Sequence, residues 1–134
     1  MNRRNGKLSR EELISQLHYF DEFADELGRL ASPAEKDRTY SLIQQYRERV
    51  ERYVTSGQQP PEAEVLIGRM VTIAYEDGGA ETYKLVLPNA SNIDEGCLSF
   101  ISPLGSKLVL SRTGDSVEVE SPAGLYRVQV VDVV

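Results

Sequence analysis

The sequence predicts an α+β protein, in which an antiparallel helical hairpin precedes an antiparallel sheet domain that carries one short helix. Apolar residues recur at helical spacing up to residue 56, and their period becomes two after Pro60-Pro61. The polar stretch "TSGQQPPEAE" separates the two patterns. We therefore expect a helical hairpin over residues 1–56, a linker over 57–64 and a sheet domain over 65–134.

The first helix is predicted by a heptad pattern with a start signal before it. Ser9 and Glu12 in "SREE" have the spacing of a capping box, which satisfies two free backbone N–H groups at a helix start. The apolar stripe steps alternately by four and three residues, as in a coiled coil. Its members are Leu13, Leu17, Phe20, Ala24, Leu27 and Ala31.

The second helix repeats both signals. "SPAE" places Ser32 as N-cap, Pro33 at the first helical position and Glu35 as the other half of a second capping box. The apolar positions are Ile43, Tyr46, Val50 and Tyr53. Because only one or two residues separate the helices, the chain must turn back sharply, which predicts an antiparallel hairpin.

The second half reads as about five strands with a short helix after the third. "RMVTIAY" and "ETYKLVL" alternate around the turn "EDGGA", and "CLSFI" follows. Ser102 is then a plausible N-cap and Pro103 suits the first position of a short helix. "SVEVE" and "LYRVQVVDV" complete an antiparallel sheet around a "SPAG" turn.

Composition and charge argue against two classes of function, nucleic-acid binding and membrane association. The chain has 134 residues and a net charge of −6; residues 63–134 carry five Lys/Arg against ten Asp/Glu. This balance lacks the basic excess that neutralises phosphates, so we expect no direct nucleic-acid binding. No apolar run is long enough to span a bilayer, so no membrane association is expected. A single cysteine, Cys97, fits a reducing cytoplasm.

Several motifs of the second half occur in the order found in a known family. They are "IGRMV", "ETYKLV", "SFISPLG", "GDSVEV" and "PAGLYRV". Because of these motifs, the second half of the chain resembles the C-terminal domain of the bacterial Gre transcription factors. In that family, as here, an antiparallel helical hairpin precedes this domain. The resemblance implies an FKBP-like fold for this domain. An FKBP-like sheet alone does not carry prolyl isomerase activity.

The resemblance also implies a partner and a surface. In the Gre family this domain docks on the rim of the RNA polymerase secondary channel, which makes the "SPLG" corner a candidate docking surface. Leu104 would then be partly exposed; a purely structural corner would instead bury it. The candidate partner-binding residues are Ile101, Ser102, Pro103, Leu104 and Gly105.

The hairpin departs from the family pattern, in which two acidic residues at the tip of a longer arm help hold a catalytic magnesium ion. Helices of about 20 residues are about 30 Å long, and family arms that reach the active site exceed them by about three turns in each helix. Glu35 and Asp37 are the only carboxylates at this tip, and their side chains diverge on a helix. In shape the chain is closer to the short-armed relative Rnk.

We therefore expect a non-enzymatic regulator, with no catalytic residues and no cofactor, that binds RNA polymerase without stimulating transcript cleavage. Two alternatives stay open: a transcript-cleavage factor that uses Glu35 and Asp37, and an interaction module with a partner other than polymerase. The sequence leaves open whether the protein activates or inhibits transcription. It also leaves open the oligomeric state, to which Ile14, Phe23 and Leu30 on the hairpin stripe would contribute in a self-paired form.

Overall fold

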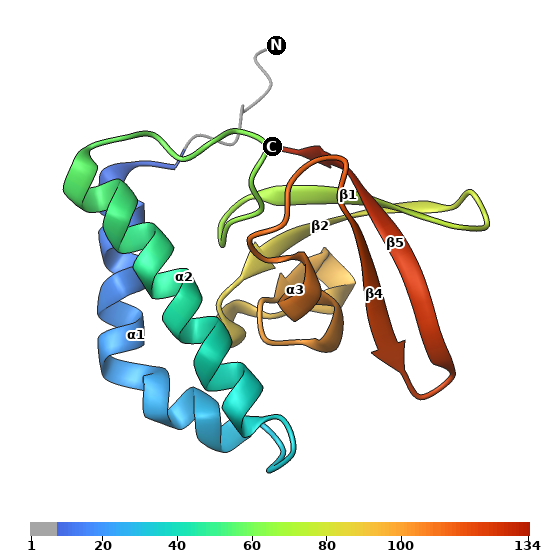
Figure 1. Ribbon diagram of the computed structural model, residues 1–134, viewed down its shortest axis with the longest axis horizontal. Coiled ribbons are helices and arrows are strands. Elements are labelled where there is room, and N and C mark those ends of the chain that lie inside the picture. The colour runs from blue at the N-terminus through green and yellow to red at the C-terminus, as the bar shows by residue number, and fades with distance from the viewer. Residues whose placement is uncertain (1–7) are drawn as a thin grey trace. The chain divides into compact units, whose positions relative to one another are not determined.

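The computed structural model describes residues 8–134, which form two compact units. Residues 8–60 make a helical hairpin, coloured blue to green in Figure 1, and residues 61–134 make a sheet unit, coloured green to red. The predicted order of a helical hairpin followed by a sheet domain is confirmed. Within the described residues, no helix has the length and apolar character needed to cross a bilayer.

Helix α1, Arg10–Leu30, begins with the predicted capping box. The Ser9 hydroxyl accepts the Glu12 N–H at 3.1 Å, and the Glu12 carboxylate accepts the Ser9 N–H at 3.4 Å. Two N–H groups that have no partner within the helix are thereby satisfied. The carboxylates of Glu11 and Glu12 in the first turn also lie at the positive end of the helix dipole.

Helix α2, Lys36–Ser56, begins later than the sequence predicts, and its predicted capping box is wrong. Glu35 occupies the N-cap position and makes no side-chain cap hydrogen bond. The Ser32 carbonyl instead accepts the Glu35 N–H at 2.9 Å, which closes a separate turn before the helix. This turn completes the reversal of the chain before α2 starts. The helix ends at Gly57, whose φ of 73° lies in the left-handed region that glycine adopts readily.

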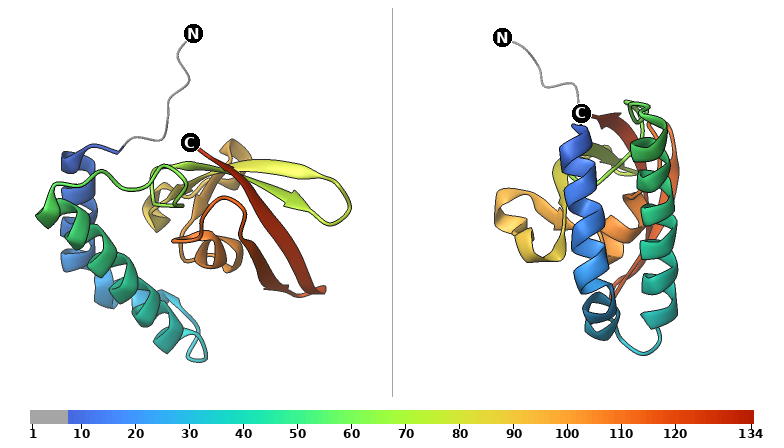
Figure 2. Two further views of the ribbon diagram at one scale, coloured as in Figure 1. Left: turned by 45° about the horizontal axis from the view of Figure 1, so that its top comes forward. Right: turned by 90° about the vertical axis from the view of Figure 1, so that its left-hand side faces the viewer.

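Helices α1 and α2 pack side by side (Figure 2, right). All four predicted apolar positions of α2 are buried. On α1, Leu13, Phe20 and Leu27 are buried, whereas the intervening Leu17 and Ala24 are half-buried. The rings of Phe20 and Tyr46 meet edge to face with centroids 5.8 Å apart.

One buried polar contact joins the two helices. The Tyr46 hydroxyl donates to Oε1 of Gln16 at 2.6 Å, and both residues are buried. On the surface, Arg47 of α2 pairs with Asp21 of α1 at 2.5 Å. The buried bond contributes more than the exposed pair, because loss of one partner leaves a polar group without water.

The sheet has five strands in the order β3-β2-β1-β5-β4. Their bounds are Met70–Tyr75 for β1, Ala80–Val86 for β2, Cys97–Ser99 for β3, Ser116–Ser121 for β4 and Gly124–Val133 for β5. The β1–β2, β1–β5 and β4–β5 pairs are antiparallel, as predicted. The predicted antiparallel placement of β3 is wrong, since β3 runs parallel to β2.

The connection between β2 and β3 explains the parallel pairing. It contains two short 3-10 turns, η1 (Pro88–Ala90) and η2 (Ile93–Glu95), instead of a tight hairpin turn. These turns carry the chain back, so that β3 runs beside the last three residues of β2 with Cys97 opposite Lys84. Parallel neighbours need such a return, whereas antiparallel neighbours need only a turn.

Helix α3, Pro103–Leu108, packs against β3 and β4 (Figure 1). Its inward residues Leu104 and Leu108 join a core that the register places on one face of the sheet. The buried apolar residues of this unit include Val71, Ile73, Leu85, Phe100, Val119, Val128 and Val130.

The stretch that leads into β1 is tied to the sheet unit. Val65 donates its N–H to Ser111 at 2.8 Å and accepts from Leu110 at 2.7 Å. Arg69 is only 1% exposed, and its Nη1 donates to the carbonyls of Pro61 and Glu64 at 2.5 and 2.8 Å. The last part of the predicted linker, from Pro61 on, therefore belongs to the compact sheet unit.

The buried bond of the hairpin yields a first prediction. Tyr46→Phe removes the donor to Gln16 and should lower the free energy of unfolding by about 1–3 kcal/mol, measured by urea unfolding followed by circular dichroism. Tyr40→Phe is the matched control, because the Tyr40 hydroxyl makes a longer bond of 3.3 Å at an exposed position. Equal losses in the two variants would contradict the importance of the buried bond.

Candidate functional site

The corner between β3 and α3, residues 101–105, contains the predicted partner-binding residues, and hydrogen bonds from Ser99 and Ser102 shape it. The Ser102 hydroxyl accepts the Gly105 N–H at 3.0 Å and donates to the Ser99 carbonyl at 2.7 Å. The Ser99 hydroxyl accepts the Ile101 N–H at 3.3 Å. Ser102 is thus the N-cap of α3, as predicted, and also anchors the helix to the end of β3.

Gly105 allows α3 to begin this close to the strand. A Cβ atom built at this position would lie 2.0 Å from the Ser99 carbonyl oxygen and 2.9 Å from the Ser102 hydroxyl. Both neighbours are held in the capping arrangement, so neither can move away without breaking a bond. No side chain fits here, and glycine is required by close approach rather than by its backbone angle.

The far end of α3 is held as well. Leu110, just after the helix, has a φ of 67°, a left-handed conformation that is unfavourable for leucine. Its N–H donates to the Val65 carbonyl at 2.7 Å, which holds the chain in this conformation. The corner is therefore built on a short helix that is fixed at both of its ends.

The five predicted residues divide between surface and interior. Pro103 is exposed, and Ile101 and Ser102 are half-buried. Leu104 is only 9% exposed and Gly105 is buried, so these two shape the corner from within. The burial of Leu104 contradicts the partial exposure that the docking interpretation predicts, and it gives this side chain a folding role. On the surface, Lys107 is exposed one helical turn after Pro103 and adds a positive charge beside the corner.

The hairpin tip places Glu35 and Asp37 at the start of α2, and both are exposed. The carboxylate of Glu35 has no capping role, contrary to the sequence interpretation. Within residues 8–134, no three His, Cys, Asp or Glu side chains come together in a way that would hold a metal ion. Glu35 and Asp37 thus form at most a pair, whereas hard cations prefer several converging oxygens.

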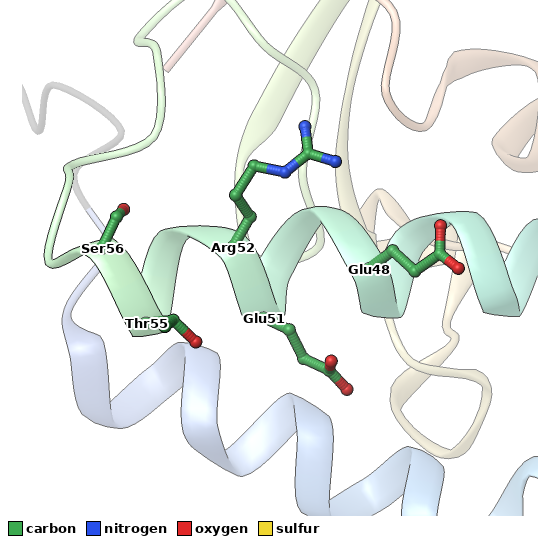
Figure 3. A pocket seen from close by; sticks show the side chains of 5 residues that line it. All are labelled: Glu48, Glu51, Arg52, Thr55 and Ser56. Atoms are coloured by element: carbon green, nitrogen blue, oxygen red, sulfur yellow. The ribbon is translucent and has the colours of Figure 1, made fainter.

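A shallow hollow along the second half of α2 does not form a second candidate binding site. Its lining side chains are Glu48, Glu51, Arg52, Thr55 and Ser56, all of them exposed. They come from one helix, and those of Glu51 and Arg52 leave it on opposite sides (Figure 3). Side chains that diverge in this way do not form a site for a small ligand.

Comparisons with known proteins match the sheet unit most directly. A family model described as the C-terminal domain of the transcription elongation factors GreA and GreB matches residues 60–134. The transcription elongation factor GreA of Thermotoga neapolitana is 41% identical over 71 residues, which are 52% of this chain and 46% of that protein. The chain thus spans about half the length of this relative.

Two further comparisons extend over the hairpin. GreA of Christiangramia forsetii is 29% identical over 119 residues, which cover 82% of this chain and 75% of that protein. The solved structure of a GreA/GreB elongation factor from Nitrosomonas europaea has a TM-score of 0.60 at 22% identity. It covers 87% of this chain and 92% of the other, and at this identity it shows a shared fold.

The close contact at Gly105 yields a second prediction. Gly105→Ala should lower the free energy of unfolding by about 1–3 kcal/mol, the usual cost of overpacking, measured by urea unfolding. Gly79→Ala is the control, because a Cβ there meets only side-chain atoms, of the exposed Asp77 carboxylate at 3.1 Å and of the Tyr75 ring at 3.9 Å. Both substitutions remove the same backbone freedom from the unfolded chain. A stability of Gly105→Ala equal to that of the control would contradict the packing argument.

Proposed function

The chain belongs to the GreA/GreB family of transcription elongation factors, and on this premise we propose that it is a transcription regulator that binds RNA polymerase. The observation that carries the proposal is the family match over residues 60–134, which includes the whole sheet and the corner. The proposed site of binding is the rim of the polymerase secondary channel, and the proposed place of action is the cytoplasm.

The corner supplies the contact in this proposal. Pro103 is exposed at the start of a helix whose two ends are fixed, so it loses little conformational freedom on binding. Ile101 and Ser102 extend the surface, while Leu104 and Gly105 support it from beneath. A preorganised apolar projection of this kind suits a shallow pocket on a protein partner.

The hairpin limits what the protein would do on polymerase. Each helix has 21 residues, about 32 Å at 1.5 Å per residue. Arms that reach the polymerase active centre are expected to be about three turns longer. We propose that this hairpin crowds the channel mouth and competes with longer-armed factors, and that the protein has no enzymatic role and no cofactor.

Two observations bear on the alternatives, a transcript-cleavage factor and an interaction module with another partner. The Glu35 carboxylate has no capping role and is exposed beside Asp37, which would favour a cleavage factor if the tip reached the active centre. Phe23 is 37% exposed on α1, which would favour an interaction module with another partner. The family match favours polymerase over another partner, and the length of the hairpin weighs against the cleavage factor.

Retention on immobilised RNA polymerase core enzyme tests the proposal. The chain should be retained at low salt and released by an excess of a GreA factor, because both would occupy the same rim. Failure of retention would overturn polymerase binding. Retention without release by GreA would overturn the proposed position on the enzyme.

A third prediction separates binding from folding at the corner. Pro103→Ala should melt near the wild-type temperature and bind polymerase about tenfold more weakly, because truncation of an anchor commonly costs this much or more. Pro122→Ala, at an exposed proline in the turn after β4, should leave binding unchanged. Leu104→Ala should instead lower the free energy of unfolding by about 2–5 kcal/mol, because its side chain is buried.

If Pro103→Ala binds polymerase with wild-type affinity, Pro103 is not part of the polymerase contact. Fluorescence anisotropy of the labelled protein against core enzyme gives the affinities, and thermal unfolding by circular dichroism gives the stabilities. Measuring both quantities for each variant prevents a folding defect from being read as a binding defect.

A fourth prediction concerns the hairpin tip. Backtracked elongation complexes should shorten their transcripts no faster with this protein than without it, because a hairpin of about 32 Å delivers no metal-holding carboxylates to the active centre. Transcript length on denaturing gels is the measurement, with a GreA factor as positive control. Stimulation that Asp37→Ala abolishes would establish the cleavage alternative.

A further inference from the structure

Three tyrosines and one carboxylate lie on the core-bearing face of the sheet, and none of them belongs to the corner. Strand register places them there, because directly paired residues point to the same face. Tyr83 pairs with Val71, Glu81 with Ile73, and Tyr126 with Val119. The remaining tyrosine, Tyr75, pairs with Val128. All four of these aliphatic partners are buried.

The tyrosines are not fully covered by the core that they border. Tyr75, Tyr83 and Tyr126 are half-buried, and Glu81 is exposed. The rings of Tyr75 and Tyr126 have centroids 6.2 Å apart at an interplanar angle of 37°. The Tyr83 hydroxyl donates to the Glu81 carboxylate. We call these four residues the Tyr–Glu patch.

Glu81 lies close enough to all three tyrosines to act on their ionisation. The hydrogen bond to Glu81, followed by burial, raises the pKa of Tyr83 far above 10. Burial, and then the charge of Glu81, raise the pKa of Tyr75 and of Tyr126. The three hydroxyls are therefore neutral near pH 7, and Glu81 carries the only charge of the patch.

The surroundings of the patch are acidic. Glu76 and Asp77 are exposed in the turn between β1 and β2. The basic residues of the five strands are Lys84 and Arg127, and register places both on the opposite face, paired with Met70 and Glu118. Within the described strands, no basic side chain balances Glu81 on its own face.

We propose that the Tyr–Glu patch binds a basic segment of a partner protein, with an arginine or lysine over the tyrosine rings and beside Glu81. Aromatic faces attract guanidinium and ammonium groups, and arginine also pairs with a carboxylate through two parallel bonds. Nucleic-acid bases also stack on tyrosine, but Glu81 and the acidic turn repel phosphates. The chemistry of the patch thus favours a basic peptide, and this surface is separate from the proposed polymerase contact.

Fluorescence anisotropy with a labelled peptide of alternating glycine and arginine tests the proposal on the full chain. The peptide should bind at low salt. The same peptide with neutral citrulline in place of arginine should bind at least about tenfold more weakly. Glu81→Gln should weaken arginine-peptide binding about fivefold. Glu120→Gln, which changes net charge equally on the opposite face of the sheet, should leave it within about twofold of wild type.

A pair of variants at Tyr126 separates the ring from the hydroxyl. Tyr126→Phe keeps the aromatic face and should retain binding, whereas Tyr126→Leu should weaken it about fivefold. Thermal unfolding checks that Tyr126→Leu folds, and Glu81→Gln, at an exposed position, provides the test if it does not.

Four results would overturn the proposal. They are no binding of the arginine peptide, equal binding of the citrulline peptide, equal losses in Glu81→Gln and Glu120→Gln, and tighter binding of a labelled oligothymidine. Because no polymerase is present in this assay, its failure would leave the proposed polymerase binding untouched. Loss of polymerase retention would likewise leave this proposal standing.

Discussion

The fold of the corner depends on the absence of a side chain at Gly105. Because a Cβ there would lie 2.0 Å from the Ser99 carbonyl oxygen, the first turn of α3 can pack against the end of β3 only if position 105 is a glycine. That close start lets Ser102 cap the helix and bond to Ser99 at the same time. Pro103 is then presented outward while Leu104 enters the core, so one constraint sets both the packing and the surface.

The sheet unit therefore carries two surfaces of different chemistry. The corner presents the exposed Pro103 with the positive charge of Lys107 beside it, and it suits a shallow pocket on a structured partner. The Tyr–Glu patch combines aromatic rings with a carboxylate in an acidic surrounding, and it suits a basic segment. The hairpin is held by a buried tyrosine–glutamine bond and by buried apolar residues of both helices, and no three metal-binding side chains converge within the described residues.

Periodicity and capping predicted what depends on neighbours in sequence: the hairpin, the Ser9 cap, the Ser102 cap and most strands. They failed where the same local sequence allows a different turn or connection. A turn closed by the Ser32 carbonyl displaced the predicted capping box, and the η1–η2 return made β3 parallel. The buried Arg69 and the Tyr–Glu patch were missed because register and packing, rather than spacing, assemble them. The partial exposure predicted for Leu104 was wrong, because the motif does not show which side of the short helix faces the core.

Site-specific photo-crosslinking tests the central claim, polymerase contact at the corner, most directly. A photoreactive residue at position 107, exposed on α3, is compared with one at position 129, exposed on the opposite face of the sheet. The account predicts crosslinks to a polymerase subunit from position 107 that an excess of GreA suppresses, and none from position 129. Equal crosslinking from both positions, or crosslinking from position 129 alone, would contradict it.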